Sequence, residues 1–219
     1  MGKGALMESA TEAIQAITML AKMVELKDGH TEEHCERLAV IALAIGKRLG
    51  LPQERLEQLR YGALLHDVGK LGIEDDILGK PGRLTPSEWV EMRRHPTIGK
   101  EIVEKIDSLG VVARIVEEHH ERVDGKGYPK GLKGDEILLE ARIVVVADAY
   151  DAMRSDRPYR QGLSKEEAIR ELRRNAGSQF DPLVVKVFLE ILDEETVCVM
   201  GVTDDVVRTN LPVERPCTA

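Results

Sequence analysis

The stretch YGALLHDVGK, residues 61–70, begins with apolar residues and ends with an imidazole, a carboxylate and an ammonium group. The apolar residues before His66 predict a buried helix, so His66, Asp67 and Lys70 follow directly after a segment that packs in the core. Burying isolated charges is costly unless they pair with each other or bind a metal ion. The three residues therefore form either a structural network or part of a functional site.

Apolar residues at helical spacing recur on both sides of this stretch and predict an all-α fold. Thr85 to Glu88 and Ser164 to Glu167 have the pattern of capping boxes, which mark helix starts. His95-Pro96 predicts a helix break, because the residue before proline disfavours helical geometry. The expected helices cover approximately residues 9–24, 31–49, 52–66, 85–94, 98–106, 109–120, 136–153, 164–175 and 182–194.

Two valine-rich segments are compatible with either a strand or a helix. In ARIVVVADAY, residues 141–150, the apolar residues keep helical spacing, which favours a helix. In TVCVMGV, residues 196–202, they do not, and we expect one short strand near the C-terminus. We divide the chain into an N-terminal helix (1–24), one domain (25–194) and a C-terminal extension (195–219).

Composition excludes several classes of protein. The formal net charge of −8 argues against binding a nucleic-acid polymer, which requires a basic surface. No apolar run is long enough to cross a bilayer, so no membrane contact is expected. The three cysteines are odd in number and have no CxxC spacing, which indicates reduced thiols in a cytoplasmic protein.

All six histidines lie between residues 30 and 120. A single histidine is more often a hydrogen-bonded core or surface residue than a ligand, but this set falls at predicted helix ends, where separate segments converge. Asp148, within an apolar run, and Asp67 add carboxylates. Imidazole and carboxylate donors suit Fe, Mn, Zn or Ni better than Mg or Ca, and they exceed what one ion can use. The pattern predicts two or three divalent metal ions at convergent helix ends.

The motifs LLHDVGKLGIEDDIL (64–78), HHERVDGKGYP (119–129) and DAYDAMRSDRPYR (148–160) resemble, in this order, the HD-GYP branch of the HD phosphohydrolase superfamily. The resemblance covers about residues 25–190 and implies an all-α HD-like helical bundle. It also implies a phosphodiesterase that hydrolyses the bacterial messenger cyclic di-GMP to pGpG, and in some cases to GMP, with iron or manganese. Because no receiver or sensor region precedes the motifs, a fragment of a longer signalling protein is compatible with the sequence.

Carried over position by position, the resemblance implies a metal-ligand set with Asp67 as the bridging carboxylate. Lys70 would contact a substrate phosphate beside the catalytic Asp67, and Arg157 and Arg160 would hold the other phosphate. Without the resemblance, the simpler interpretation of the two arginines is a solvated pair on the protein surface. The implied metal ligands are His34, His66, Asp67, His95, His119, His120 and Asp148.

His30 departs from the family pattern, in which a glutamate or a residue that binds no metal precedes the His34 position by four residues. The i, i+4 spacing from His30 to His34 suits a shared metal, so His30 is a candidate ligand for a third ion. A solvent-facing histidine at the helix start is equally compatible with the sequence.

Two alternatives remain open. Metal ligands do not recognise a nucleotide base, so another nucleotide could be the substrate. Alternatively, the chain could bind the messenger or a partner without catalysis. The loop GKGYPKGLKG, residues 125–134, is either a plain connector or a lid that docks diguanylate cyclase (GGDEF) domains. The resemblance leaves the oligomeric state open, a homodimer included.

Overall fold

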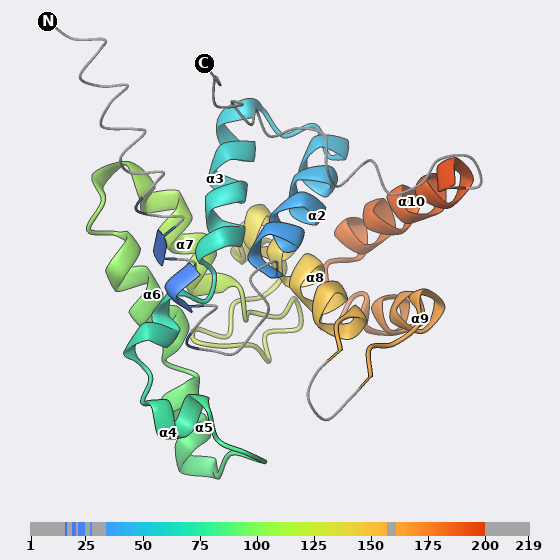
Figure 1. The fold of residues 1–219 in the computed structure, drawn as a ribbon. Helices are drawn as coiled ribbons and strands as arrows, with labels where there is room; N and C mark the ends of the chain where they lie inside the picture. The colour runs from blue at the N-terminus through green and yellow to red at the C-terminus, as the bar shows by residue number, and fades with distance from the viewer. Residues whose placement is uncertain are drawn as a thin grey trace, which may run out of the picture.

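The computed structural model describes residues 16, 19–20, 22–24, 27, 34–156 and 161–199, without the side chains of Asp107 and of residues 195–199. In this part of the chain the structure is helical, and its only β-type pairings are two isolated bridges. The α-helices are α2 (His34–Arg48), α3 (Gln53–Leu65), α4 (Asp75–Leu78), α5 (Pro86–Met92), α6 (His95–Val103), α7 (Gly110–Glu118), α8 (Leu139–Arg154), α9 (Lys165–Asn175) and α10 (Pro182–Val199) (Figure 1). Three short 3₁₀ helices are η1 (Val68–Gly72), η2 (Asp107–Leu109) and η3 (Gly134–Glu136).

Local signals in the sequence explain where several helices begin. The Thr85 and Ser164 side chains each accept a hydrogen bond from a backbone N–H three residues later, which confirms both capping boxes at α5 and α9. The predicted break before Pro96 is also confirmed, because α5 ends at Met92 and α6 begins at His95. Proline is tolerated in the first turn of a helix, so Pro96 starts α6 rather than only ending α5.

The two valine-rich segments both form helices. The helix expected for residues 141–150 is confirmed within α8. The strand expected over residues 196–202 is wrong where the structure describes it, because α10 continues through Val199. Apolar residues between Val184 and Leu192 of α10 pack into the hydrophobic core. Because extending a formed helix is easier than starting a new element, the helix continues past these residues to Val199.

Two hydrophobic cores hold the helices together. The larger core joins residues of α2, α3, α8 and α10, and the smaller one joins the end of α3 with η1, α6 and α7. The last two residues of α3 belong to different cores: Leu64 to the larger and Leu65 to the smaller. His66, the next residue, therefore follows the point where the two cores meet.

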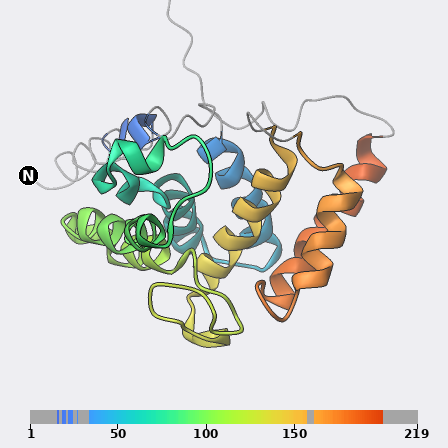
Figure 2. The ribbon, with the colours of Figure 1, turned by 90° about the horizontal axis from the view of Figure 1, so that it is seen from below.

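The segment between α7 and α8 extends from the helices as a separate loop at the lower edge of Figure 2. Glu121 is buried and its carboxylate accepts hydrogen bonds from the backbone N–H groups of Lys130, Gly131 and Leu132 at 2.6, 3.1 and 3.0 Å. Gly127 lies so close to the chain after α7 that an added Cβ would be 2.5 Å from the Cα of Glu121. The loop is thus fastened to the residues that directly follow His119 and His120.

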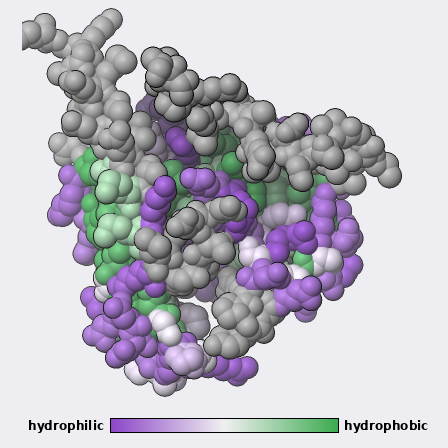
Figure 3. All heavy atoms as spheres, in the orientation of Figure 1, coloured by the Kyte–Doolittle hydropathy of each residue, from purple (hydrophilic) through white to green (hydrophobic). Residues whose placement is uncertain are grey.

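On the face shown in Figure 3, hydrophobic side chains gather over the region of α6 and α7, whereas the α9 edge is mainly hydrophilic. In the described part of the chain, no helix combines the length and the apolar character that crossing a bilayer requires.

Candidate metal centre

Seven of the predicted ligands come together in two groups, in each of which the ligand atoms lie within 4.8 Å of one another. His66, His95 and His119 are almost fully buried, with at most 2% of each residue exposed. Most of the members lie at or just beyond the ends of helices α2, α3, α6 and α7, while Asp148 lies within α8. One group consists of Asp67, His95, His119 and His120, and the other of His34, His66 and Asp148.

Asp67 connects the two groups because its two oxygens face different histidines. Its Oδ2 lies 3.3 Å from Nε2 of His66, whereas its Oδ1 lies 3.3 Å from Nε2 of His95 and 3.8 Å from Nε2 of His119. Lys70 also reaches this carboxylate, with Nζ 2.7 Å from Oδ2. The 3₁₀ helix η1, rather than a continuation of α3, brings Lys70 to this position.

The backbone orients three of the imidazoles in the same way. The Nδ1 atoms of His66, His95 and His119 donate to the carbonyl oxygens three residues earlier, at 2.8, 2.8 and 2.6 Å. Because a carbonyl oxygen can only accept, Nδ1 carries the proton and Nε2 of the neutral ring keeps its lone pair. The three Nε2 atoms are therefore directed to the centre of the cluster.

The acceptor atoms at the centre of the cluster lie close enough together to hold a cation. Nε2 of His95 lies 3.3 Å from Nε2 of His119, and Oδ1 of Asp67 lies nearby, so three acceptor atoms face one another. Acceptors repel unless a positive charge lies between them, and a metal ion meets this need with the donor types present. The residues thus fit a divalent metal ion.

The pKa values of the group agree with this chemistry. Burial lowers the pKa of His95 to about 4, so its imidazole is in the neutral form that binds metals. Burial also lowers the pKa of His66, but the charges of Asp67 and Asp148 outweigh it and raise that pKa to about 9. Burial raises the pKa of Asp67, yet the charges of Lys70 and His66 hold it well below its usual range. At neutral pH and without an ion, His66 therefore carries a proton on Nε2, and a bound metal ion would take the place of that proton.

Asp151 is a residue of this centre that the sequence analysis missed. Its Oδ2 accepts a hydrogen bond from Nδ1 of His34 at 2.6 Å, which directs Nε2 of His34 towards Asp148 at 3.6 Å. Arg37 binds both oxygens of Asp151, at 2.8 and 3.1 Å. Metal-binding histidines commonly have such a carboxylate partner. The i, i+3 spacings His34 to Arg37 and Asp148 to Asp151 were the available signals.

The loop after α7 also reaches the centre. The ring of Tyr128 stacks on His120, with centroids 4.8 Å apart and an angle of 25° between the planes.

Three predicted site residues, His30, Arg157 and Arg160, lie outside the described residues.

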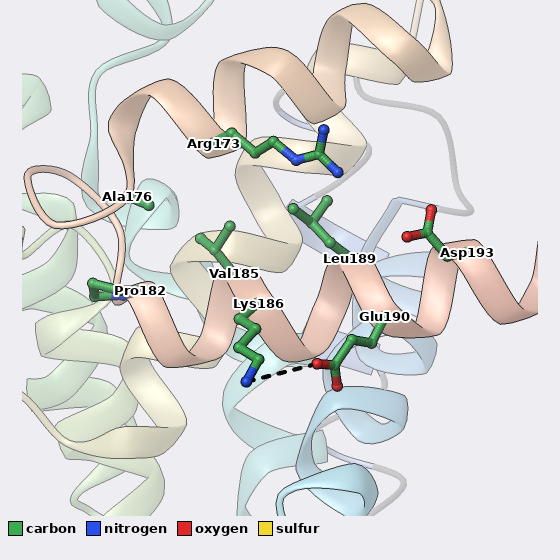
Figure 4. A pocket seen from close by; sticks show the side chains of 8 residues that line it. All are labelled: Arg173, Ala176, Pro182, Val185, Lys186, Leu189, Glu190 and Asp193. Atoms are coloured by element: carbon green, nitrogen blue, oxygen red, sulfur yellow. Dashed lines mark ion pairs between the residues drawn. The ribbon is translucent and has the colours of Figure 1, made fainter.

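An open pocket between α9 and α10 is separate from this centre (Figure 4). Lys186 and Glu190, at its edge, form an ion pair of 3.9 Å. The lining of this pocket includes none of the clustered histidines and aspartates. Its lining consists of Arg173, Ala176, Pro182, Val185, Lys186, Leu189, Glu190 and Asp193.

Comparison with known proteins assigns a family to this arrangement. The family described as HD domain matches residues 18–184. A cyclic di-GMP phosphodiesterase of Thermotoga maritima is 42% identical over 187 residues, which cover 84% of this chain and 50% of that protein. A 3′3′-cGAMP-specific phosphodiesterase of Vibrio cholerae is 37% identical over 182 residues, covering 82% of this chain and 40% of that protein.

Solved structures agree in fold. A crystal structure of a cyclic GMP-AMP-specific phosphodiesterase of V. cholerae matches with a TM-score of 0.66 and 22% identity, covering 86% of this chain and 51% of that one. The chain spans about half the length of the curated relatives it matches. The all-α HD-like fold predicted from the motifs is confirmed. The chain therefore belongs to the HD domain family.

Proposed function

We propose that this chain is a metal-dependent phosphodiesterase that hydrolyses cyclic di-GMP to linear pGpG, a step that a second cleavage to GMP can follow. The observation that carries the proposal is the position of Asp67, whose two oxygens face two separate groups of metal-binding side chains. Two-metal sites of this kind suit in-line attack on a phosphodiester. The relatives at 37–42% identity that are named phosphodiesterases support the same reaction class.

The proposed metal ligands are the seven clustered side chains, with Asp67 shared between two ions. Their imidazole and carboxylate donors suit iron or manganese, with zinc and nickel as further options. His30 stays a proposed ligand for a third ion. The full proposed set is His30, His34, His66, Asp67, His95, His119, His120 and Asp148.

The chemistry divides between the ions and the chain. When bound, divalent ions supply Lewis acidity that activates water and offsets phosphate charge. Lys70 places an ammonium group beside the same carboxylate and would offset charge on a non-bridging phosphate oxygen. Arg157 and Arg160 would hold the second phosphate. One water molecule is consumed: its oxygen bonds to phosphorus, the phosphorus–O3′ bond breaks, and O3′ leaves with a proton.

A second candidate substrate is 3′3′-cGAMP, because three relatives from V. cholerae are named as specific for it. The two messengers differ in one base and share the phosphodiester ring. The metal centre alone cannot distinguish them, so a recognition site for the base must do so.

The test is turnover by anaerobically purified protein, with metal content measured on the same sample. Iron- or manganese-loaded protein should convert cyclic di-GMP to pGpG, followed by chromatography and mass spectrometry, and Asp67→Ala should not. Preferential turnover of 3′3′-cGAMP would support the second candidate. Metal-loaded wild-type protein that binds but does not cleave any cyclic dinucleotide would favour a non-catalytic binding module.

Four further proposals concern the context of the enzyme. The loop 125–134 carries exposed Lys126, Lys130 and Lys133 and is the proposed docking surface for GGDEF domains. The division at residues 24 and 194 and a homodimeric assembly stay predictions. A cytoplasmic location is supported by Cys35, which is a buried free thiol.

A further inference from the structure

A tryptophan and an arginine lie side by side on α5, outside the metal centre. Trp89 is 47% exposed, although large aromatic side chains usually lie mainly inside a protein. Arg93 follows Trp89 by four residues, so both lie on the same helical face. The Cζ atom of Arg93 lies 5.9 Å from the centroid of the Trp89 ring, which is cation–π distance. The capping box at Thr85 fixes the start of this helix and hence its face.

The same arginine connects α5 to the metal centre. Cζ of Arg93 lies 5.3 Å from the centroid of Tyr128, and Tyr128 stacks on His120 at 4.8 Å. His120 belongs to the group that contains Asp67. Trp89, Arg93, Tyr128 and His120 therefore form a continuous series of contacting planar groups, which we call the Trp89 ladder. It leads from the surface to the centre.

Arg93 differs from two cations near it, Lys80 and Arg94, in its partners. Lys80 pairs with Glu88 at 2.6 Å, and Arg94 pairs with Glu91 at 2.8 Å. Within the described residues, Arg93 has aromatic neighbours but no carboxylate partner. A guanidinium group that lies against aromatic rings rather than a carboxylate keeps N–H donors available for other acceptors. The ladder thus presents an aromatic surface and unneutralised donors beside a phosphodiester-cleaving centre.

We propose that the Trp89 ladder is the site that binds a guanine base of the cyclic dinucleotide substrate. The exposed face of Trp89 stacks on the base, and the edge of Arg93 donates to O6 and N7 of guanine. Stacking on an aromatic ring tolerates any base, whereas paired donors select the O6 and N7 acceptors of guanine. Adenine presents an amino donor in place of O6, so Arg93 disfavours it. This inference rests on the proposed function and deepens it, since it names the groups that choose the base.

The chain offers a direct probe, because Trp89 is its only tryptophan. Tryptophan emission of the metal-loaded protein should be quenched by cyclic di-GMP and less by cyclic di-AMP at equal concentration. Ribose 5-phosphate, which has no base, should leave the emission unchanged. Equal emission with and without cyclic di-GMP, at concentrations that saturate turnover, would overturn the ladder while leaving the proposed hydrolysis intact.

Two variants separate stacking from base selection. Trp89→Ala should raise KM for cyclic di-GMP and cyclic di-AMP alike, by roughly 5- to 100-fold, and Trp89→Phe should restore most of the affinity. Arg93→Ala should reduce the preference for cyclic di-GMP over cyclic di-AMP, measured as the ratio of kcat/KM values. Arg94→Ala, which removes the neighbouring exposed arginine, is the matched control and should keep that ratio.

Other outcomes are equally informative. If the wild-type protein shows guanine-selective quenching but no hydrolysis, the ladder stands and the proposed function fails. If Trp89→Ala and Arg93→Ala lower metal content or melting temperature without changing KM or base preference, the ladder is structural and the inference is wrong.

Discussion

Four histidines of the metal centre are orientated by hydrogen bonds that their Nδ1 atoms make. Three of them use a carbonyl oxygen of the preceding helical turn, so the helix itself directs each ring. His34 is different because it stands at the start of α2 and uses the side chain of Asp151 instead. The orientation of His34 therefore depends on a residue 117 positions away in the sequence.

Asp151→Asn should weaken the centre without removing any proposed ligand. The amide keeps the shape of the carboxylate but loses the charge that holds both His34 and Arg37. Changes to such supporting residues typically cost 10–100-fold in metal affinity or activity, and we expect a loss of about that size. Metal content after dialysis against competing chelator measures it. Asp135→Asn changes an exposed carboxylate and is the control; an equal effect of both variants would contradict the role of Asp151.

Lys70→Met should separate charge stabilisation from metal binding. The methionine side chain retains much of the length of lysine but removes the ammonium group that lies beside Asp67. We expect kcat to fall by about 10²–10³-fold while the metal content stays the same, as for loss of one group that stabilises developing charge. Steady-state kinetics and elemental analysis give the two values. Lys186→Met on α10 is the control, and a large loss of metal in Lys70→Met would assign Lys70 to the scaffold.

Sequence and structure differ in what they reveal about individual residues. The motif residues His66, Asp67, His119 and His120 are adjacent pairs in the chain, so their proximity could be predicted. Asp151 and Arg37 lie 114 positions apart, and no local pattern predicts their contact. The same holds for Arg93 and Tyr128, which come from a helix and a loop. Contacts of this kind appear only once the helices are packed.

Helices and loops were predictable where local chemistry decides the backbone. Capping boxes place the starts of α5 and α9 because the side chain bonds a backbone group of its own turn. The start of α6 was predicted three residues late, at 98 instead of 95, because Pro96 was read only as a helix breaker. The strand expected from residue 196 was wrong through Val199, because the loss of helical spacing was weighed without the helix that precedes it.

Gly69 determines how closely η1 approaches α6. A Cβ at this position would lie 1.8 Å from the carbonyl oxygen of His95, so Gly69→Ala must push the two elements apart. This separates Asp67 from His95, and we expect loss of bound metal and a destabilisation of about 1–3 kcal/mol from overpacking. Chemical denaturation and elemental analysis measure both.

Gly110→Ala is the matched control for this change. Gly110 starts α7 and an added Cβ would meet no atom within 4 Å, so the variant should keep its metal and its stability. If Gly69→Ala kept wild-type metal content, the close approach of η1 and α6 would not be required for the centre.

Glu121 should control the order of the loop between α7 and α8. Glu121→Ala leaves three backbone N–H groups without their buried acceptor, and hydrogen bonds to charged groups each contribute about 1.5–3 kcal/mol. Amide hydrogen exchange at Lys130, Gly131 and Leu132 should become roughly 10- to 100-fold faster. Glu101→Ala, at an exposed position of α6, should not change these rates. Unchanged exchange in Glu121→Ala would mean that the loop is held by other contacts.

In the part of the chain that the structure describes, two hydrophobic cores meet at the metal centre. The ligand group with His34 and Asp148 comes partly from α2 and α8, which belong to the larger core. The group with His95 comes from α6 and the end of α7, which enclose the smaller core. The sequence predicted a single all-α domain, but the division of its interior depends on which helix faces meet, and periodicity does not determine that.

Metal binding should therefore stabilise the protein as a unit rather than one helix end. Ions that bind only the folded state add about 2.7 kcal/mol when present at 100 times their dissociation constant, for each independent site. For a chain of this length, that corresponds to roughly 5–10 °C in melting temperature. Calorimetry of chelator-treated and metal-loaded protein should show one transition that moves upward on loading. Asp67→Ala, which removes the carboxylate shared by both groups, should show a much smaller shift. Two separate transitions, of which metal moves only one, would show that the centre belongs to a single core.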